Sequence, residues 1–322
     1  MTMAGRDFPR DRAEAAVLRQ VLLGASGSTL VRTMVTRAPV SRDVVRRFVA
    51  GETVDAAVAA VRALVADGLQ VSLDRLGEDV LEPAQATATT DAYVSLFARL
   101  GDEGLAGAAE ASLKLSAIGQ ALDPSMALDN ARRVCDAAAA VGSTVTVDME
   151  DHSTTDLTLG TVRELRDDFP WVGAVLQAYL RRTESDCVDL AGPGSRVRLC
   201  KGAYQEPGSV AYQDIHEVDR SYVRCLKVLM AGEGYPMVAT HDPRLIEIAG
   251  ALAARWRRGP DSFEYQMLYG IRPQEQIRLA SGGGTVRVYL PYGEDWYAYF
   301  MRRLAERPAN VLFFLRSVVS KS

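Results

Sequence analysis

Residues that build disulfide frameworks and zinc sites are scarce in this 322-residue chain, which has four cysteines and three histidines. The cysteines lie at positions 135, 187, 200 and 225, and none of them forms a CxxC motif. A chain of this length needs no disulfide to stabilise its core. We therefore expect free thiols in a cytoplasmic protein, and no metal site.

Long apolar runs and a large excess of one charge are also missing. No apolar run reaches the length of about 18 residues that a membrane-spanning helix needs, and the N-terminal MTMAGRDFPRDRAEAA lacks the apolar segment of a secretory signal. A net charge of −4 argues against a nucleic-acid partner. With 48% hydrophobic and 24% charged residues, the chain belongs to the globular class.

The first part of the chain has the pattern of helices. Between about residues 9 and 68, apolar residues recur at steps of three and four. Ser41 and Thr53 stand where helix N-caps are needed, and Asp67 and Gly68 close the last of these segments. We expect residues 1–69 to form an N-terminal helical arm.

From residue 70 onward, strand-length apolar runs alternate with amphipathic segments, which is typical of parallel strands covered by helices. There are eight runs, at residues 70–77, 111–116, 144–150, 173–180, 197–204, 236–242, 263–269 and 285–293. Eight such units predict an α/β fold, a closed (β/α)₈ barrel over residues 70–322. An open doubly wound sheet is the alternative, but no GxGxxG motif follows the first run.

Active sites of such barrels lie at the carboxyl ends of the strands. Polar residues occur in or directly after all eight runs, and we expect them at these ends, including Glu264 with Gln266 and Arg287 with Tyr289. Buried charges cost several kcal/mol each unless they are paired or bind a ligand, since they lose their hydration.

Lysine is rare here, with four residues among 37 basic ones, so a lysine inside an apolar run requires an explanation. Lys114 in SLKLS alternates with Leu113 and Leu115 and so faces the opposite side, which points it into the barrel mouth. It fits a structural ion pair with Asp148, a cation for an anionic substrate, or a Schiff-base amine.

Two further segments suit an anionic ligand. In RLCKGAY, Arg198 and Lys201 stand beside Tyr204, and two cations next to an aromatic ring suit a cofactor with phosphates and a flat ring system. Thr240, His241 and Asp242 precede a helix with Pro243 at its first position, which fits a helix cap and also an anion site.

The last helix carries the pair Arg302 and Arg303, which suits a carboxylate as a double guanidinium fork but is also common on solvated surfaces. Tyr299, Arg303 and Glu306 follow three- and four-residue spacing and should share one face of the helix. Tyr299 also lies three positions before Arg302, so an aromatic ring should stand beside that guanidinium.

These segments, in this order, resemble the proline dehydrogenase family of flavoenzymes. The similarity extends from about residue 73 to 310 and is carried by LDRLGE, SLKLS, VDMED, VLQAYL, VRLCKGAY, ATHD, FEYQMLYGIR, RVYLPYG and YFMRRLAERPAN. The length resembles that of the short monofunctional bacterial members. The resemblance implies a distorted (β/α)₈ barrel whose final helix lies over the mouth.

The resemblance also implies roles for individual residues. Asp148 and Arg198 match the positions with active-site roles. The positions that bind the substrate carboxylate or pack around its ring correspond to Lys114, Leu268, Tyr289, Arg302 and Arg303. The FAD-binding positions correspond to Met149, Gln177, Arg198, Lys201, Gly202, Ala203, Tyr204, Thr240 and His241. Glu78 matches a glutamate that pairs with Arg302 as a gate.

The implied activity is oxidation of L-proline to Δ1-pyrroline-5-carboxylate by hydride transfer to N5 of FAD, with a quinone as electron acceptor and peripheral membrane association. Two other functions fit the residues. A Schiff-base aldolase would use Lys114 or Lys201. A binding or scaffold barrel would bind a small molecule without turnover.

Overall fold

A computed structural model describes residues 45–306 of the protein. The helical segments predicted before residue 45 and the N-cap predicted at Ser41 lie outside the described residues.

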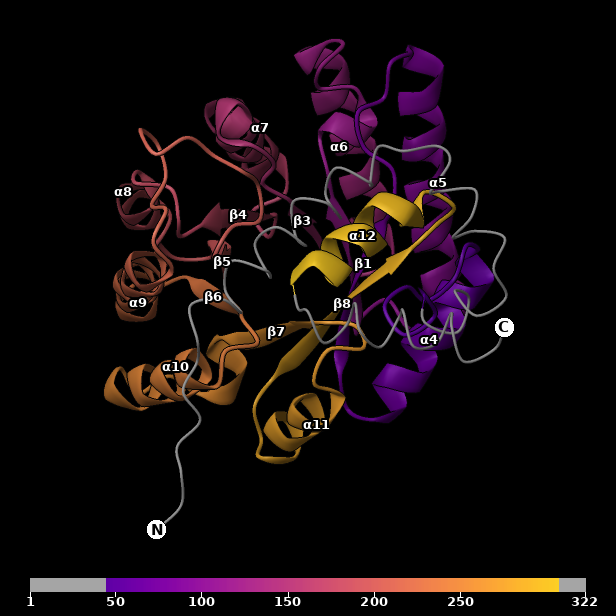
Figure 1. Ribbon diagram of the computed structural model, residues 1–322. Helices are drawn as coiled ribbons and strands as arrows, with labels where there is room; N and C mark the ends of the chain where they lie inside the picture. The colour runs from indigo at the N-terminus through magenta and orange to yellow at the C-terminus, as the bar shows by residue number, and fades with distance from the viewer. Residues whose placement is uncertain (1–44, 307–322) are drawn as a thin grey trace, which may run out of the picture.

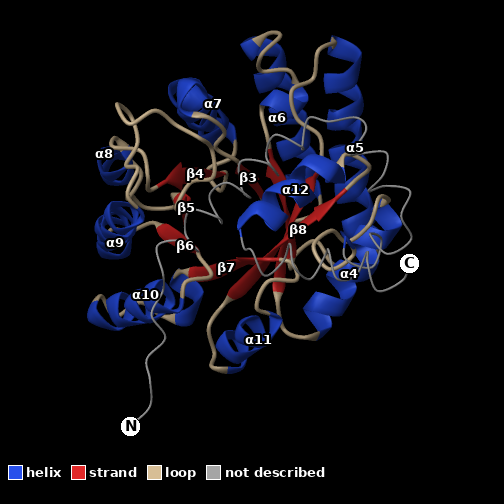
Figure 2. Cartoon of the chain, viewed as in Figure 1, coloured by secondary structure: helices blue, strands red, loops and turns tan. Residues whose placement is uncertain are grey.

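Eight parallel strands form one closed barrel in which each strand pairs with its neighbours in chain order, and β8 pairs with β1 (Figure 2). The strands are β1 Gln70–Arg75, β2 Ala109–Leu113, β3 Val145–Val147, β4 Gly173–Gln177, β5 Arg196–Cys200, β6 Tyr235–Ala239, β7 Glu264–Leu268 and β8 Val286–Tyr292. All eight predicted runs are confirmed as strands. The barrel is confirmed and the doubly wound alternative is wrong.

Helices α5 to α11 stand outside the ring of strands (Figure 1). The helices are α4 Val54–Ala66, α5 Pro83–Asp102, α6 Pro124–Ala140, α7 Thr155–Asp168, α8 Thr183–Asp189, α9 Ile215–Ala231, α10 Pro243–Arg255, α11 Pro273–Ser281 and α12 Trp296–Glu306. Short 3₁₀ segments lie at Ser116–Ile118, His152–Thr154 and Pro260–Ser262.

Helix α4 occupies the place on the barrel wall that a helix following β8 would take in a regular barrel. It begins at the predicted cap, because Thr53 Oγ1 accepts a hydrogen bond of 3.2 Å from Ala56 N–H. Its apolar residues Val58 and Val61 are buried and pack in one core with β1 and β8. The predicted boundary at residue 69 between a helical arm and the barrel stays a prediction.

Because α4 covers this part of the wall, α12 is displaced and lies across the end of the barrel in front of β1 and β8 (Figure 1). Arg302 on α12 donates to Glu78 after β1 at 2.8 Å, and Trp296 donates to Glu52 at 2.9 Å. Phe300 is buried against Leu76. The expectation that the final helix lies over the mouth is confirmed.

Side chains of the strands alternate between the two faces of the barrel wall. On β1, Val71 and Leu73 face outward into the core that the helices cover, whereas Ser72 and Asp74 face inward. The inside of the barrel is polar along much of its length, where barrels of this class more often hold branched apolar residues.

The structure corrects the expected position of two charges. Glu264 is the first residue of β7 and Arg287 is the second of β8, so both lie at the amino ends of the strands, away from the mouth. They pair with each other at 2.8 Å and are buried. Their role is therefore inside the lower barrel and not at the predicted site.

Candidate active site

Lys114 follows β2 directly and enters the mouth of the barrel as predicted, but its main partner differs from the expected one. Its Nζ lies 2.6 Å from Asp74 Oδ1 and 3.9 Å from Asp148 Oδ2. Burial by itself would lower the pKa of Lys114, but the two carboxylates outweigh it and raise the pKa above its usual value. Lys114 is therefore a fixed cation at neutral pH.

Asp148, the residue after β3, connects the other groups at the mouth. Its Oδ1 accepts from Arg198 Nη1 at 2.6 Å and from Ser112 Oγ at 2.7 Å, while its Oδ2 accepts from Tyr289 OH at 2.8 Å. The Arg198 guanidinium lies 5.3 Å from the centroid of the Tyr289 ring. The structure thus brings together Lys114, Asp148, Arg198 and Tyr289.

The guanidinium of Arg198 is fully engaged inside the barrel, where the residue is 4% exposed. Arginine has five N–H donors, and the hydrogen bonds of Arg198 use its Nε, Nη1 and Nη2 atoms. The acceptors are Gln266, Ser112, Asp148, Ser72 and Glu110. Direct contact with a bound flavin would require Arg198 to exchange one of these hydrogen bonds.

Over the mouth, the predicted pair of Glu78 and Arg302 is present at 2.8 Å, with both side chains partly exposed. The expected shared face of Tyr299 and Arg303 is confirmed, because the Arg303 guanidinium lies over the Tyr299 ring, 5.2 Å from its centroid, while the expected neighbourhood of Tyr299 and Arg302 stays a prediction. Residues three and four apart are both neighbours on a helix, and the spacing alone does not choose between them. Tyr204 is 38% exposed at the same rim.

The predicted cofactor residues lie on neighbouring strand ends, and one of them has an unused polar atom. Gln177, the last residue of β4, donates from Nε2 to the carbonyls of Met149 at 2.9 Å and Glu150 at 2.8 Å. Its Oε1 is buried and has no hydrogen-bond partner among the described residues. Such an atom is costly unless a ligand donates to it.

Gly202 occupies a position at which no side chain fits. Its φ is +109°, and a Cβ at this position would lie 2.3 Å from Tyr179 Cδ1, so the Tyr179 ring occupies the space. The ring is fixed by a hydrogen bond of 3.3 Å from its hydroxyl to Glu206 Oε1. Contacts of Gly202 and Ala203 with a cofactor stay predictions.

Lys201, after β5, is paired with carboxylates of two helices. Its Nζ lies 2.6 Å from Asp219 on α9 and 3.4 Å from Asp242, the N-cap of α10. The predicted cap is confirmed, since Asp242 accepts from Arg244 N–H at 3.0 Å. Thr240 Oγ1 accepts from the main chain of Asp242 at 3.1 Å.

His241 joins β6 to β7 and so places Leu268. Its Nε2 accepts a hydrogen bond of 2.9 Å from the main-chain N–H of Leu268, which assigns the ring proton to Nδ1 when the ring is neutral. Both residues therefore lie on the same rim as Lys201 and Tyr204.

These residues fit FAD in their chemistry. The buried Oε1 of Gln177 is an acceptor for an N–H group such as that of an isoalloxazine ring would supply, and Lys201 with the N-terminus of α10 suits a diphosphate.

Several residues of the site have no predicted role, although Asp74 and Gln266 belong to the polar groups expected at the strand ends. They are Asp74, Glu110, Ser72, Ser112, Gln266 and Glu206. The first five alternate with outward-facing apolar residues within strands, and this alternation is a signal that could have identified them. Glu206 anchors both Tyr179 and His152 from a loop, for which the sequence offers no such signal.

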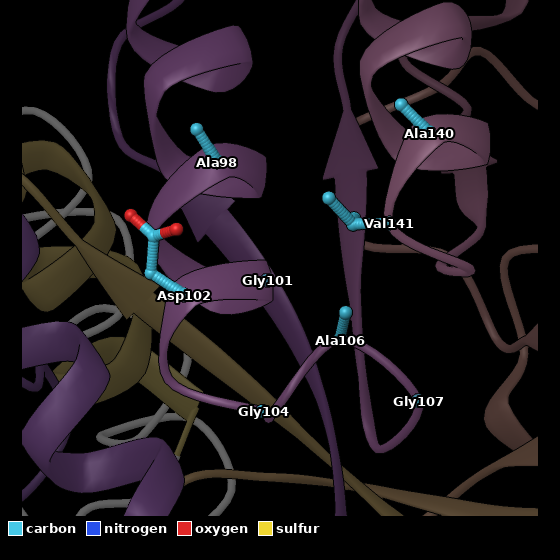
Figure 3. Close-up of a pocket in the computed structure, with 8 residues that line it drawn as sticks. All are labelled: Ala98, Gly101, Asp102, Gly104, Ala106, Gly107, Ala140 and Val141. Carbon is cyan, nitrogen blue, oxygen red and sulfur yellow. The ribbon is translucent and has the colours of Figure 1, made fainter.

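Residues 45–306 contain no group of three or more side chains suited to a metal ion and no helix that could cross a membrane. A shallow hollow between the ends of α5 and α6 lies at the amino ends of the strands, opposite the mouth (Figure 3). Asp102 is the one ionisable residue among those that line it.

Comparison with known sequences gives close relatives over most of the chain. The family model described as "Proline dehydrogenase" matches residues 57–316. The chain is 42% identical over 278 residues to "Proline dehydrogenase" of Deinococcus radiodurans, covering 85% of this chain and 89% of that protein. It is 38% identical over 305 residues to "Proline dehydrogenase 1" of Bacillus subtilis strain 168, covering 95% of this chain and all of that protein.

Solved structures share the fold. Proline utilization A (PutA) of Bdellovibrio bacteriovorus, inactivated by N-propargylglycine, aligns with a TM-score of 0.78 at 23% identity. The alignment covers 91% of this chain and 37% of that longer protein.

Proposed function

Because the chain belongs to the proline dehydrogenase family, we propose that it oxidises L-proline to Δ1-pyrroline-5-carboxylate with FAD as its cofactor. The observation that carries this proposal is the position of Arg302, which α12 holds over a mouth lined by Lys114, Asp148 and Tyr289. A cationic rim above buried polar groups suits an amino acid with one carboxylate and an apolar ring.

The cations place the substrate. Lys114, Arg302 and Arg303 bind the carboxylate, and Leu268 and Tyr289 pack around the ring. Since the carboxylate is fixed at one end, the ring carbon on the far side of the nitrogen is presented at a defined position, and such placement accounts for much of the rate. Glu78 holds Arg302 at 2.8 Å and releases it to the substrate, which is the proposed gate.

When bound, FAD would supply the hydride acceptor, so no residue of the protein needs to form a covalent bond to the substrate. The residues proposed to hold it are Met149, Gln177, Arg198, Lys201, Gly202, Ala203, Tyr204, Thr240 and His241. Asp148 and Arg198 form the charged floor below the substrate. Arg198 stabilises negative charge from a position that Asp148 and Gln266 fix at 2.6 Å and 2.5 Å.

The Schiff-base alternative is disfavoured by the state of the lysines. A nucleophilic lysine must lose its proton, and the pKa of Lys114 is raised, with burial outweighed by Asp74 and Asp148. Lys201 is held 2.6 Å from a carboxylate of Asp219. Each of the two lysines is therefore engaged in an ion pair and is not free to attack a carbonyl carbon.

A quinone is the proposed electron acceptor, and peripheral membrane association is the corresponding proposed location. Both rest on the family resemblance.

The test is an absorbance spectrum of the purified protein, followed by addition of L-proline without oxygen. The proposal predicts the visible band of oxidised flavin, its bleaching by proline, and a cyclic imine product that o-aminobenzaldehyde traps. A protein without flavin, or a flavin that proline leaves oxidised, would refute it.

A further inference from the structure

The barrel interior below the mouth contains a continuous hydrogen-bonded network of charges. Glu110, 1% exposed, lies within 4 Å of the guanidiniums of Arg196, Arg198 and Arg287. Burial disfavours its charge, but the three arginines outweigh burial and lower the pKa of Glu110 below its usual value, so it is an anion. Four acidic and four basic side chains balance in this interior. They are Asp74, Glu110, Asp148, Glu264, Lys114, Arg196, Arg198 and Arg287.

Gln266 on β7 connects the lower part of this network to the upper part. Its Oε1 accepts from Arg198 Nε at 2.5 Å, and its Nε2 donates to Glu264. Glu264 is held in turn by Arg287 at 2.8 Å. One end of the Gln266 amide therefore faces a donor and the other an acceptor, and this polarity fixes the amide orientation.

Neither obvious replacement reproduces this connection. Methionine has a similar length but gives Arg198 Nε no comparable acceptor. Glutamate keeps an acceptor toward Arg198 but places a second carboxylate against Glu264. Since Gln266 is 3% exposed, water does not replace a lost partner.

The connection continues from Arg198 to the mouth. Arg198 Nη1 binds the same Asp148 carboxylate that accepts from Tyr289 OH at 2.8 Å and lies 3.9 Å from Lys114 Nζ. A guanidinium is planar and rigid, so a rotation at Nε moves Nη1 with it.

We propose that Gln266 is a positioning residue for proline oxidation: its amide orients Arg198, and Arg198 in turn orients Asp148 and Tyr289 beside the substrate. The proposal rests on the proposed function. It assigns to Gln266 no contact with substrate or cofactor.

The test compares Gln266→Met and Gln266→Glu with Asn130→Leu as a matched control. Asn130 on α6 is also buried, and its amide donates to the Ile118 carbonyl at 3.0 Å, outside the barrel interior. Four quantities are measured for each: flavin content, Tm, kcat with KM for proline, and the flavin midpoint potential.

We expect Gln266→Met to retain flavin and to lose about 10- to 100-fold in kcat, the effect of a small misplacement in an active site. Its midpoint potential shifts to more negative values, because Arg198 no longer stabilises the reduced flavin from its fixed position. Gln266→Glu lies closer to wild type in both quantities. Asn130→Leu lowers Tm but leaves kcat and the potential unchanged.

A crystal structure of Gln266→Met supplies the direct readout, with the Arg198 to Asp148 distance expected to exceed 2.6 Å clearly. Wild-type kcat, potential and distance in this variant would overturn the proposal. If Gln266→Met does not fold, Gln266→Asn, whose amide is one methylene too short to reach Arg198 Nε, decides by the same distance and potential. Failure of the wild-type protein to oxidise proline refutes the proposed function itself, before any variant is compared.

Discussion

Replacing Lys114 by methionine separates the structural role of this lysine from its role in binding. The side chain is 12% exposed and stands between Asp74 and Asp148. Asp148 retains Arg198 at 2.6 Å, but no second cation of residues 45–306 lies within 4.0 Å of Asp74. The substitution therefore leaves one buried carboxylate without a counter-charge.

The structure sets the expected size of both effects. Removing one partner of a buried ion pair destabilises a protein by about 3–5 kcal/mol, and the 2% exposed Asp74 side chain places this site in that class. Loss of one charged contact to the substrate carboxylate removes about 1.5–3 kcal/mol of binding, which corresponds to a roughly 10- to 150-fold rise in KM.

A double substitution distinguishes the two effects. Asp74→Asn removes the stranded charge, so Lys114→Met with Asp74→Asn should recover most of the stability. The proline KM should remain high in both variants, because neither restores the cation. Urea unfolding and steady-state kinetics measure the two quantities on the same preparations.

The reasoning is refuted if the double variant recovers the wild-type KM together with its stability. Lys114 would then act through the architecture of the mouth alone. Flavin content serves as the control, since Lys114 is not among the residues proposed to bind FAD.

Two further predictions concern the rim. Gly202→Ala places a Cβ 2.3 Å from the Tyr179 ring, so urea unfolding should show a larger loss of stability than in Gly283→Ala, where φ is +84° but nothing lies within 4 Å. The hydrogen bond from Arg244 lowers the pKa of Asp242 from 3.8 to about 2. The ionised carboxylate therefore stabilises the folded protein above pH 3.8, and this contribution is lost as the pH falls toward 2. The Tm of the wild-type protein should therefore exceed that of Asp242→Asn at neutral pH, and the two Tm values should be equal at about pH 2. A Tm difference that persists at pH 2 would contradict this.

The sequence predicts the barrel well because buried parallel strands have a local signature. Eight apolar runs of strand length, separated by amphipathic segments, correspond to β1 through β8, and Thr53 caps α4 as its position predicts. Both signals depend on residues close together in the chain.

Partners inside the barrel are harder to predict, because they come from strands far apart in sequence. Asp148 is the expected partner of Lys114, yet Asp74 lies closer, since β1 and β2 are adjacent and Asp74 pairs with Ser112 in register. Glu110 precedes the predicted second run by one residue and was missed for that reason. The engagement of Arg198 by five side chains follows from closure of the barrel, which no local pattern encodes.

The position of α12 is also a tertiary effect. Its sequence is that of an ordinary amphipathic helix, and the family resemblance supplied its place over the mouth. The structure adds the physical reason, because α4 packs against β1 and β8 and leaves no room on the wall.

The most direct test of the central claim, that the arginines of α12 recognise the substrate carboxylate, is the ratio of anaerobic flavin reduction rates with L-proline and with pyrrolidine. Pyrrolidine has the same ring and amine but no carboxylate. We predict a large preference for proline in the wild-type protein and its near-complete loss in the double variant Arg302→Met with Arg303→Met, with flavin still bound. An unchanged preference in the double variant would contradict the account.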